Sequence, residues 1–387
     1  MRKLRSTISL LALAGVSLAG CSQPGGPAVP ATWQAAGLSG DASALQTIYS
    51  FTGVPDGTSP NGDLIAVKGA LYGTTANGGV SNLGAVFKVS LAGNEQMLFS
   101  FGGGAGSNSP NSGLLYRSGT LYGTTNTVSY DIDAKGNEHV LHALGGGADG
   151  YDEQGPLVYF NSLFYGATQL GGEKQCNSGC GLVYAVSSAG KEHVVYDFKG
   201  AGDGFDPQGG VALAGSTLYG TTSYGGKDDS GTIYSLTANG TKKTIYNFTG
   251  DSDGSYPTGR LLISQGTIYA ATRYGGQYGY GSVVAISAAG KATVLHQFSN
   301  KADGGQPNGS LVLVKGTIYG TTLQGGSGGK GVVFSLTHAG QEKVLGDFHS
   351  SNGDTPQAGL VFLNGSLYGS TIKGGPKNAG TIFKVKP

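Results

Sequence analysis

From residue 44 to the end, the chain is a succession of short apolar or alternating runs, each bounded by glycine. The stretch that starts at Pro257 illustrates the unit: PTGRLLISQG, TIYAATRYGGQYGYG, SVVAISAAG and KATVLHQFSNKADGG. Such runs are typical of β-strands, and no stretch shows helical periodicity over ten or more residues. The pattern predicts four strands per unit, called A to D below.

The unit is repeated along the chain, and the pentapeptide LYGTT of strand B marks it. Its tyrosine and the variants of that position recur at intervals of 50, 43, 54, 50, 50 and 49 residues. The marker residues are Tyr72, Tyr122, Tyr165, Tyr219, Tyr269, Tyr319 and Tyr368. The sequence therefore contains seven copies of one four-stranded unit.

Seven antiparallel four-stranded units of this length predict an all-β, seven-bladed β-propeller, with an open solenoid as the rival fold. The two ends of the chain favour the ring. Residues 45–51 (LQTIYSF) match the D strands KTIYNF and EQMLFSF, whereas the last unit stops after the C strand GTIFKV. We therefore expect the amino-terminal strand to complete the seventh blade, which would also remove an exposed sheet edge.

Ahead of the repeats, residues 1–20 combine a basic start, an apolar run and small residues, as in an export signal. LAGC, which ends at Cys21, resembles the bacterial lipoprotein box and implies cleavage before Cys21 and lipid on its thiol; a plain secretory signal is the alternative. Residues 21–43 are predicted to form a flexible linker, and residues 44–387 the propeller. Trp33, within the linker, is expected to pack incidentally against the ring rather than to form a binding site. By the same resemblance, serine at position 22, where an inner-membrane retention signal would have aspartate, favours the outer membrane. We therefore expect a lipid-anchored protein of the cell envelope.

Composition narrows the classes of partner. The net charge is +1 and only 12% of the residues are charged, which removes the electrostatic basis for nucleic-acid binding. The 73 glycines have no three-residue period, and 38% hydrophobic residues argue against disorder. Apart from the signal, no segment is apolar enough to span a membrane. We expect a monomer without a cofactor, held at the membrane by its lipid.

Besides Cys21, the sequence has two cysteines, Cys176 and Cys180. In an exported protein, two cysteines this close most simply form a small disulfide that closes a loop. A zinc site is the alternative, but it would need further ligands, and no histidine lies nearby in the sequence.

The repeated unit resembles the GloVer repeat family of bacterial exported proteins. The copies LYGTTANGGVSNLGAVFKVS, LYGTTSYGGKDDSGTIYSLT and IYGTTLQGGSGGKGVVFSLT carry the resemblance, which covers nearly the whole chain after the linker. It implies export and varied membrane anchors, but no established activity. The second unit departs from the pattern, because NTVSYDIDAKG follows LYGTT without a GG loop.

The loops predict where binding residues lie. The A–B and C–D turns are short and belong to one face, whereas the D–A and B–C loops are longer, vary between blades and belong to the other. The B–C loops of the variable face carry Tyr224, Tyr274, Tyr278 and Tyr280 among polar residues. Exposed tyrosines suit carbohydrate or peptide contacts, although they could merely cover the tops of the blades.

A second candidate site lies at the entry of strand A. The repeat aligns one polar residue per blade there: Asn61, Asn111, Gln154, Gln208, Thr258, Asn308 and Gln357. Near the axis, these residues could form a polar ring that holds a small ligand or water, or each could simply satisfy nearby backbone. Two positions further on, Asp63 and Arg260 add opposite charges in blades one and five.

Nothing in the sequence predicts catalytic residues or a metal site. Asp followed by Gly recurs in the D–A loops, as at Asp56, Asp203, Asp253 and Asp303, and is ordinary turn chemistry rather than a calcium loop. Four of the histidines fall in the rim strands, including His142 and His296, and none lies near the axis.

We therefore predict an extracytoplasmic, lipid-anchored protein that binds or scaffolds glycans or proteins on its variable face. The alternative is a polysaccharide lyase or hydrolase that uses the aspartates of that face. A quinone-dependent dehydrogenase ranks third, because the only tryptophan lies outside the repeats.

Overall fold

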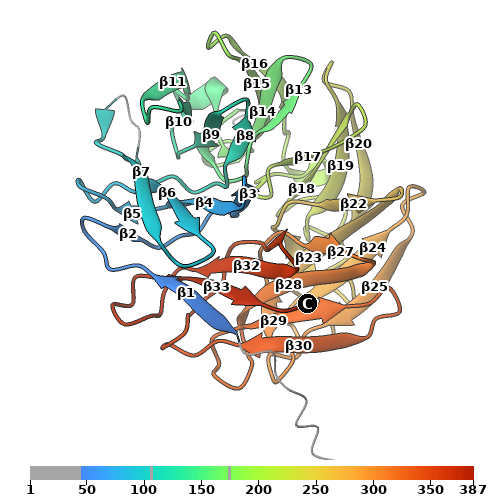
Figure 1. The fold of residues 1–387 in the computed structure, drawn as a ribbon. Helices are drawn as coiled ribbons and strands as arrows, with labels where there is room; N and C mark the ends of the chain where they lie inside the picture. Colours follow the sequence, from blue (N-terminus) through green and yellow to red (C-terminus); the bar gives the residue numbers. More distant parts are fainter. Residues whose placement is uncertain (1–44, 105–107, 173–175) are drawn as a thin grey trace, which may run out of the picture. The chain divides into compact units, whose positions relative to one another are not determined.

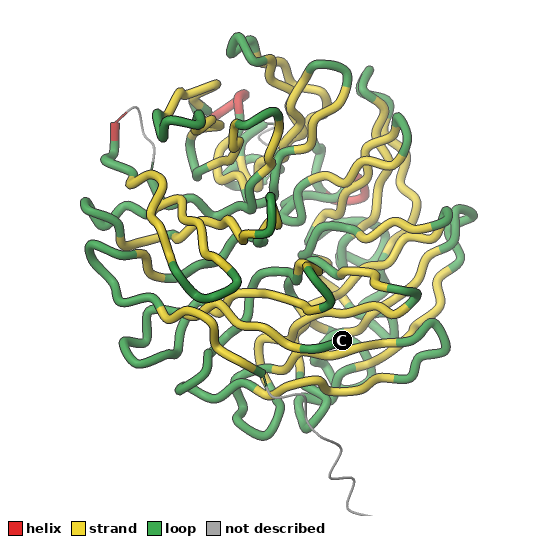
Figure 2. Tube along the Cα trace, viewed as in Figure 1, coloured by secondary structure: helices red, strands yellow, loops and turns green. Residues whose placement is uncertain are grey.

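A computed structural model describes residues 45–104, 108–172 and 176–387, all within one compact unit, Asp41–Pro387. Antiparallel sheets built on four strands each follow one another around a ring of seven blades (Figure 1). Figure 2 shows strands and connecting loops around the whole ring, and its short helical segments include the turns Gly147–Asp149 and Ala201–Asp203. The seven-bladed propeller predicted from the repeats is confirmed.

The strands follow the predicted order A to D in each blade. The A strands are β3 (Ile65–Val67), β8 (Leu115–Arg117), β13 (Val158–Phe160), β17 (Val211–Ala214), β22 (Leu262–Ser264), β27 (Val312–Val314) and β31 (Val361–Leu363). The B strands are β4 (Ala70–Thr75), β9 (Thr120–Thr124), β14 (Leu163–Leu170), β18 (Thr217–Thr222), β23 (Thr267–Tyr274), β28 (Thr317–Gln324) and β32 (Ser366–Thr371).

The C and D strands complete the blades. The C strands are β6 (Ala85–Ser90), β10 (Val128–Ile132), β15 (Leu182–Ser187), β19 (Thr232–Thr237), β24 (Ser282–Ile286), β29 (Val332–Leu336) and β33 (Thr381–Val385). The D strands are β7 (Glu95–Ser100), β11 (Glu138–Ala143), β16 (Glu192–Asp197), β20 (Lys242–Asn247), β25 (Ala292–Gln297), β30 (Glu342–Asp347) and, for blade seven, β1 (Gln46–Ser50).

The ring closes through its two ends. Strand β1, near the amino terminus, pairs antiparallel with β33, the last strand of the chain, and the two lie side by side in Figure 1. The Phe51 amide also donates a hydrogen bond to the Gly380 carbonyl at 3.0 Å, and the Phe51 side chain is buried. The predicted closure by the amino-terminal strand is confirmed.

Three blades contain an additional short strand that the sequence did not predict. β12 (Tyr151–Glu153), β21 (Ser255–Pro257) and β26 (Gly305–Pro307) belong to the D–A loops and pair with the far ends of the long B strands β14, β23 and β28. In blade one, the ribbon of β2 (Gly57–Thr58) and β5 (Asn77–Gly78) occupies the related place. These pairings tie the D–A loops to the blades.

The LYGTT pentapeptide is the B strand, and its glycine and threonines have separate packing roles. A Cβ atom on Gly73 would lie 2.7 Å from the Phe87 ring of the neighbouring C strand, so only glycine fits there. The last two residues of the pentapeptide, Thr74 and Thr75, are buried. The Thr74 hydroxyl donates to the Ser112 carbonyl of the next blade at 2.9 Å, so the first threonine links neighbouring blades.

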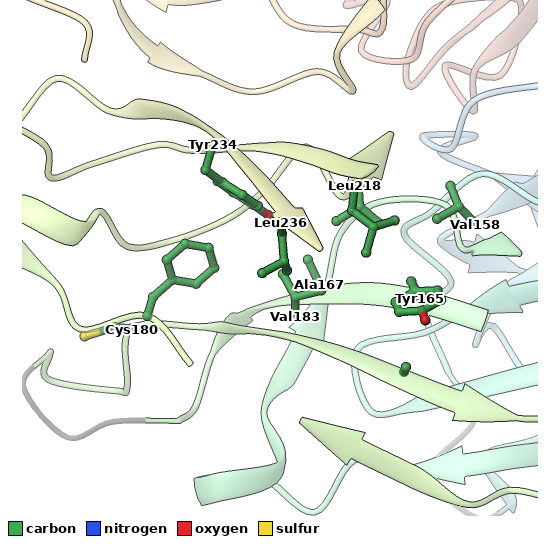
Figure 3. Packing of buried hydrophobic residues seen from close by; sticks show 11 residues of the cluster. Val158, Tyr165, Ala167, Cys180, Val183, Leu218, Tyr234 and Leu236 are labelled. Atoms are coloured by element: carbon green, nitrogen blue, oxygen red, sulfur yellow. The ribbon is translucent and has the colours of Figure 1, made fainter. Parts of the chain in front are cut away.

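The hydrophobic core lies between successive blades. Figure 3 shows one such cluster, in which Val183 of blade three meets Leu218, Tyr234 and Leu236 of blade four. The Tyr234 ring also packs edge-on against Phe198, 5.2 Å between centroids. Burying side chains of this size contributes roughly 1.5–3 kcal/mol each.

The predicted disulfide is present in the structure. Cys176 and Cys180 are joined by an S–S bond of 2.09 Å and close a loop between β14 and β15. Cys180 is fully buried against the core cluster of blades three and four. The predicted signal peptide, the predicted lipid site at Cys21, the predicted linker and Trp33 lie outside the described residues. Within the described residues, no helix is long and apolar enough to cross a membrane.

Candidate functional site at the axial mouth

The two faces of the ring differ in their loops as predicted. The A–B hairpins are two-residue turns. In all blades but the fourth, both turn residues have positive φ angles, for example 49° at Lys68 and 80° at Gly69, which is the geometry of type I′ hairpins; in blade four only Gly215 does. The D–A and B–C loops emerge on the opposite face, here called the variable face. The entries of the A strands, and therefore the candidate polar ring, lie on the variable face.

The structure brings the seven aligned polar residues together at the axis. They line one pocket of about 110 Å³, here called the axial pocket: Asn61, Asn111, Gln154, Gln208, Thr258, Asn308 and Gln357. This volume holds a few water molecules or one polar substituent of a ligand, and is well below the roughly 300–1,000 Å³ of ordinary ligand pockets.

Part of the polar ring serves the fold. The Thr258 hydroxyl donates to the Asn308 carbonyl at 3.1 Å, and the Asn308 amide donates to the Gln357 carbonyl at 3.3 Å. Asn61 and Asn111 are joined side chain to side chain at 3.1 Å, which leaves the buried Asn61 Oδ1 without a hydrogen-bond partner. The ring therefore links neighbouring blades and still presents unused polar atoms.

Asp63 and Arg260 line the floor of the axial pocket but do not pair with each other. The Asp63 carboxylate accepts hydrogen bonds from the Gly359 amide at 2.6 Å and the Ser310 hydroxyl at 2.7 Å. The Arg260 guanidinium forms no ion pair with any described residue. Both residues also border a second cavity of about 900 Å³, which the aliphatic side chains of the A strands line further along the axis.

Two residues before each member of the ring, the backbone has a left-handed conformation, with φ between 47° and 63°. These residues are Ser59, Ser109, Asp152, Asp206, Tyr256, Gln306 and Thr355. Six of them precede proline, which excludes the right-handed helical conformation. We call these seven positions the mouth positions. The sequence analysis missed them, although their fixed distance from the aligned polar residues was a usable signal.

Aromatic side chains form a continuous row on the variable face of blades four and five. Phe205 stacks on Tyr224 with ring centroids 5.3 Å apart, Tyr224 contacts Tyr256 at 5.0 Å, and Tyr256 contacts Tyr274 at 5.6 Å. The Tyr256 hydroxyl accepts a 2.7 Å hydrogen bond from the Gln208 amide. This aromatic ladder therefore connects directly to the polar ring.

Arg273 joins three parts of the variable face. It lines the axial pocket and also an adjoining cleft of about 420 Å³ between blades five, six and seven. Its guanidinium lies 5.4 Å from the centre of the Tyr274 ring, a cation–π distance, and its buried Nε has no hydrogen-bond partner. In the same cleft, the Lys330 ammonium is paired with Asp354 at 2.9 Å. Arg273 is thus an available donor at the edge of the ladder.

Only two of the four predicted loop tyrosines belong to the ladder. Tyr224 and Tyr274 do, and their side chains are 40% and 39% exposed. Tyr280 instead packs on the hydrophobic core of blades five and six, and Tyr278 is exposed without a ring contact to any described residue. Phe205 and Tyr256, which the sequence analysis missed, take their places.

Two acidic side chains occupy mouth positions in blades three and four. Burial raises the pKa of Asp206 to about 7, and the nearby charge of Asp152 adds to this shift. Burial also raises the pKa of Asp152, against the effect of its hydrogen bond from Gln154. Asp206 Oδ1 is buried without a hydrogen-bond partner, so this group can hold a proton near neutral pH.

The aspartates of the Asp-Gly loops stabilise turns, as predicted. Asp253 accepts hydrogen bonds from the Tyr246 hydroxyl at 2.8 Å and the Thr249 amide at 2.9 Å. Asp56 forms the same bonds with Tyr49 and Thr52, each at 2.8 Å. Their carboxylates are therefore engaged within their own blade.

A polar axial mouth on a ring of seven four-stranded sheets defines the chain as a β-propeller with a candidate binding site on its variable face. The model of the Gloeobacter/Verrucomicrobia repeat family matches residues 35–176, 126–301 and 240–387. The chain therefore belongs to this family, as the repeated motif predicted. No curated protein sequence matches it.

Solved structures share the fold at low sequence identity. The extracellular domain of a hybrid two-component system from B. thetaiotaomicron is 13% identical over 89% of this chain and 41% of its own, with a TM-score of 0.57. Puromycin hydrolase is 13% identical over 84% and 51%, with a TM-score of 0.56. A gluconolactonase from Xanthomonas campestris is 12% identical over 88% and 89%, with a TM-score of 0.46. At such identities, the likeness shows the fold alone.

Proposed function

We propose that the protein binds a glycan on its variable face. One observation carries the proposal: the aromatic ladder of blades four and five leads, through the hydrogen bond between Tyr256 and Gln208, into the axial pocket. Aromatic rings offer flat apolar surfaces to the faces of sugar rings. Amide side chains offer both donors and acceptors to hydroxyl groups.

The dimensions of the site support an extended ligand. The axial pocket, at about 110 Å³, takes one polar substituent, whereas whole sugar units would lie over the ladder and in the 420 Å³ cleft. Arg273 stands where these parts meet and has a buried Nε without a partner. A carboxylate on the glycan would satisfy this guanidinium, so we expect uronate-containing chains to bind better than neutral ones.

The expected lipid on Cys21 belongs to the same proposal. A lipid anchor followed by the linker of residues 21–43 would hold the ring at the cell envelope, with the outer membrane as the favoured membrane. A propeller tethered in this way would act as a binding or scaffolding protein for envelope glycans, or for proteins that carry them. Mass spectrometry of membrane-extracted protein tests the anchor through a diacylated amino-terminal cysteine.

A glycan array tests the binding function. The mature chain with Cys21→Ser would be probed against neutral and uronate-containing oligosaccharides, together with the Tyr224→Ala variant. We expect uronate-containing oligosaccharides to be retained and Tyr224→Ala to weaken binding about 10-fold or more. The matched control is Tyr278→Ala, an exposed tyrosine outside the ladder. A signal that is absent, or equal in both variants, would contradict the proposal.

An enzyme acting on polysaccharides is the second candidate, favoured by Asp206. A carboxyl group with a pKa of about 7 is suited to general acid or base catalysis, and this one stands at the mouth beside the Gln208 end of the ladder. The assay is release of reducing or unsaturated ends from the oligosaccharides that bind. Activity lost in Asp206→Asn, with binding retained, would establish the enzyme in place of the binding protein.

A further inference from the structure

A recurrent polar contact lies on the rim of the ring, far from the axial mouth. In several blades, the penultimate residue of the D strand bonds to the aspartate that lies seven residues further along the chain. The Tyr196 hydroxyl bonds to Asp203 at 3.0 Å, and the Tyr246 hydroxyl to Asp253 at 2.8 Å. In blade two the donor is a histidine, whose Nε2 lies 3.2 Å from Asp149 Oδ1.

A third side chain lies next to each of these pairs, and it comes from the first residue of the D strand of the following blade. Where blades four and three meet, that residue is Lys242, the first residue of β20. Its ammonium group lies 2.7 Å from Asp203 Oδ1 and 2.8 Å from the Asp203 carbonyl oxygen, and only 4% of the side chain is exposed. At this junction, Asp203 therefore binds a buried cation, which is the ammonium group of Lys242.

Where blades two and three meet, the equivalent residue is an acid. Glu192 is the first residue of β16, and its pairing opposite Val186 matches the pairing of Lys242 opposite Leu236. The junction thus keeps the aspartate but lacks the ammonium group. Instead, donor atoms of His142, Asp149 and Glu192 all lie within 4.8 Å of one another.

One oxygen of the Glu192 carboxylate is left unsatisfied at this junction. Its Oε1 is shielded from solvent and forms no hydrogen bond with a described residue. The Asp149 carboxylate is held in place by the Gly145 amide at 2.7 Å.

We propose that His142, Asp149 and Glu192 bind a divalent first-row transition metal, with Zn²⁺ as the best fit. One imidazole nitrogen and two carboxylates are the ligand types that Zn²⁺ accepts at about 2.0–2.2 Å, which places ligand atoms roughly 3–4 Å apart. The observed separations reach this geometry after side-chain movement on the order of 1 Å. Three protein ligands leave room for water in the remaining positions.

The bound metal would connect two blades. His142 and Asp149 come from blade two and Glu192 from blade three, so the metal replaces the link that Lys242 makes directly between blades three and four. The same residue types recur at His296, Asp303 and Glu342, but in the described part of the chain only the first trio brings its donor atoms within 4.8 Å of one another. We therefore expect one metal ion per chain.

Isothermal titration calorimetry of untagged, EDTA-treated mature Cys21→Ser protein with ZnCl₂ tests the proposal. We expect one Zn²⁺ per chain, a rise in melting temperature on binding, and affinity about 10- to 100-fold lower in His142→Ala and in Glu192→Gln. The matched control is His139→Ala, because His139 also pairs with an aspartate, Asp131 at 3.0 Å, but has no third ligand. This control should bind Zn²⁺ like the unaltered protein.

Glu192→Lys is the decisive variant, since it installs at this junction the residue found at the next one. It should fold, lose Zn²⁺ binding, and melt without metal at least as high as the unaltered protein without metal. The proposal would be overturned if the unaltered protein bound no Zn²⁺ at micromolar concentrations. It would equally be overturned if His142→Ala and Glu192→Lys both retained full affinity, which would indicate adventitious binding elsewhere.

Discussion

The seven mouth positions around the axial pocket form two halves that have the same backbone conformation but different side chains. In blades seven, one and two, the mouth positions are Thr355, Ser59 and Ser109; in blades three to six they are Asp152, Asp206, Tyr256 and Gln306. All seven have the same left-handed conformation, so the ring closes equally well over small hydroxyl and over large residues. The larger side chains are therefore not needed for this backbone conformation. Among them, Tyr256 belongs to the aromatic ladder, and Asp206 accepts a hydrogen bond from Gln208, to which the ladder leads.

The stability of the ring depends on the four strands that every blade contains, and the loss of β1, the D strand of blade seven, should have the largest effect. Removing residues up to 52 from the mature chain deletes β1 with the partly buried Ile48 and Tyr49 and the buried Phe51. The loss should be several kcal/mol, because full burial contributes roughly 1.5–3 kcal/mol for a side chain such as Phe51 and partial burial somewhat less. Removing residues up to 41 should barely change stability. Thermal unfolding of the two truncated proteins measures this contrast, and equal melting temperatures would refute closure by β1.

The acidic half of the mouth should make stability depend on pH. The pKa of Asp206 is raised in the fold to about 7, so the folded state holds this proton more tightly than the unfolded state. The contribution is complete below the unfolded pKa of about 3.9 and is lost as pH rises through 7, on the order of 4 kcal/mol in total.

Urea unfolding from pH 4 to pH 8 measures this loss of stability. The pKa values of Glu95 and Glu342 are also raised to about 7, so these two groups lower the stability in the same pH range. Part of the fall in stability with pH should therefore remain when Asp206 is replaced. Asp206→Asn should flatten the profile, whereas Ser59→Asn, at the same position in the other half, should not. An identical pH profile in Asp206→Asn would show that this carboxyl group ionises normally.

A buried hydroxyl distinguishes blade three from blade four within the scaffold. The Tyr184 hydroxyl, which is fully buried, donates to Glu153 and contacts the Ser129 hydroxyl, both at 2.6 Å. Tyr234 is the equivalent residue of blade four, and its buried hydroxyl has no partner among the described residues. Tyr184→Phe should therefore cost roughly 1–3 kcal/mol by leaving Glu153 unpaired, and Tyr234→Phe about 0.

Urea denaturation of both variants at pH 7 tests this difference. The two substitutions remove the same atom from fully buried rings in the same strand position, so cavity effects cancel in the comparison. Equal losses of stability would mean that the Tyr184 network contributes nothing beyond packing.

The sequence could predict the ring because the relevant signals are local or periodic. Alternation and glycine spacing identify the strands, and the match of residues 45–51 to the D strands identifies the closure. The added strands β12, β21 and β26 escaped prediction, because residues between an Asp-Gly pair and a proline are typical of a turn. Their pairing depends on how far each B strand extends beyond its blade.

The candidate site could be predicted only in part. The polar ring was accessible through the repeat, whereas Tyr256 aligns only with small or polar residues, and Phe205 has an aromatic counterpart only in Tyr151 of blade three, so neither position shows a pattern. The rim trio combines His142, Asp149 and Glu192 across fifty residues and two blades, so only the strand register brings it together. Glutamate begins the D strand in blades one, two, three and six, so Glu192 carries no distinguishing signal in the sequence.

The claim that the aromatic ladder recognises the glycan is tested most directly by placing a serine, as found at the mouth position of blade one, at the mouth position of blade five. Tyr256→Ser gives blade five the residue that blade one has at Ser59, without change of backbone conformation. Titration calorimetry with the strongest uronate-containing oligosaccharide from the array should show affinity about 30-fold lower, with unfolding free energy changed by less than about 0.5 kcal/mol. Unchanged affinity in Tyr256→Ser would contradict recognition through the aromatic half of the mouth.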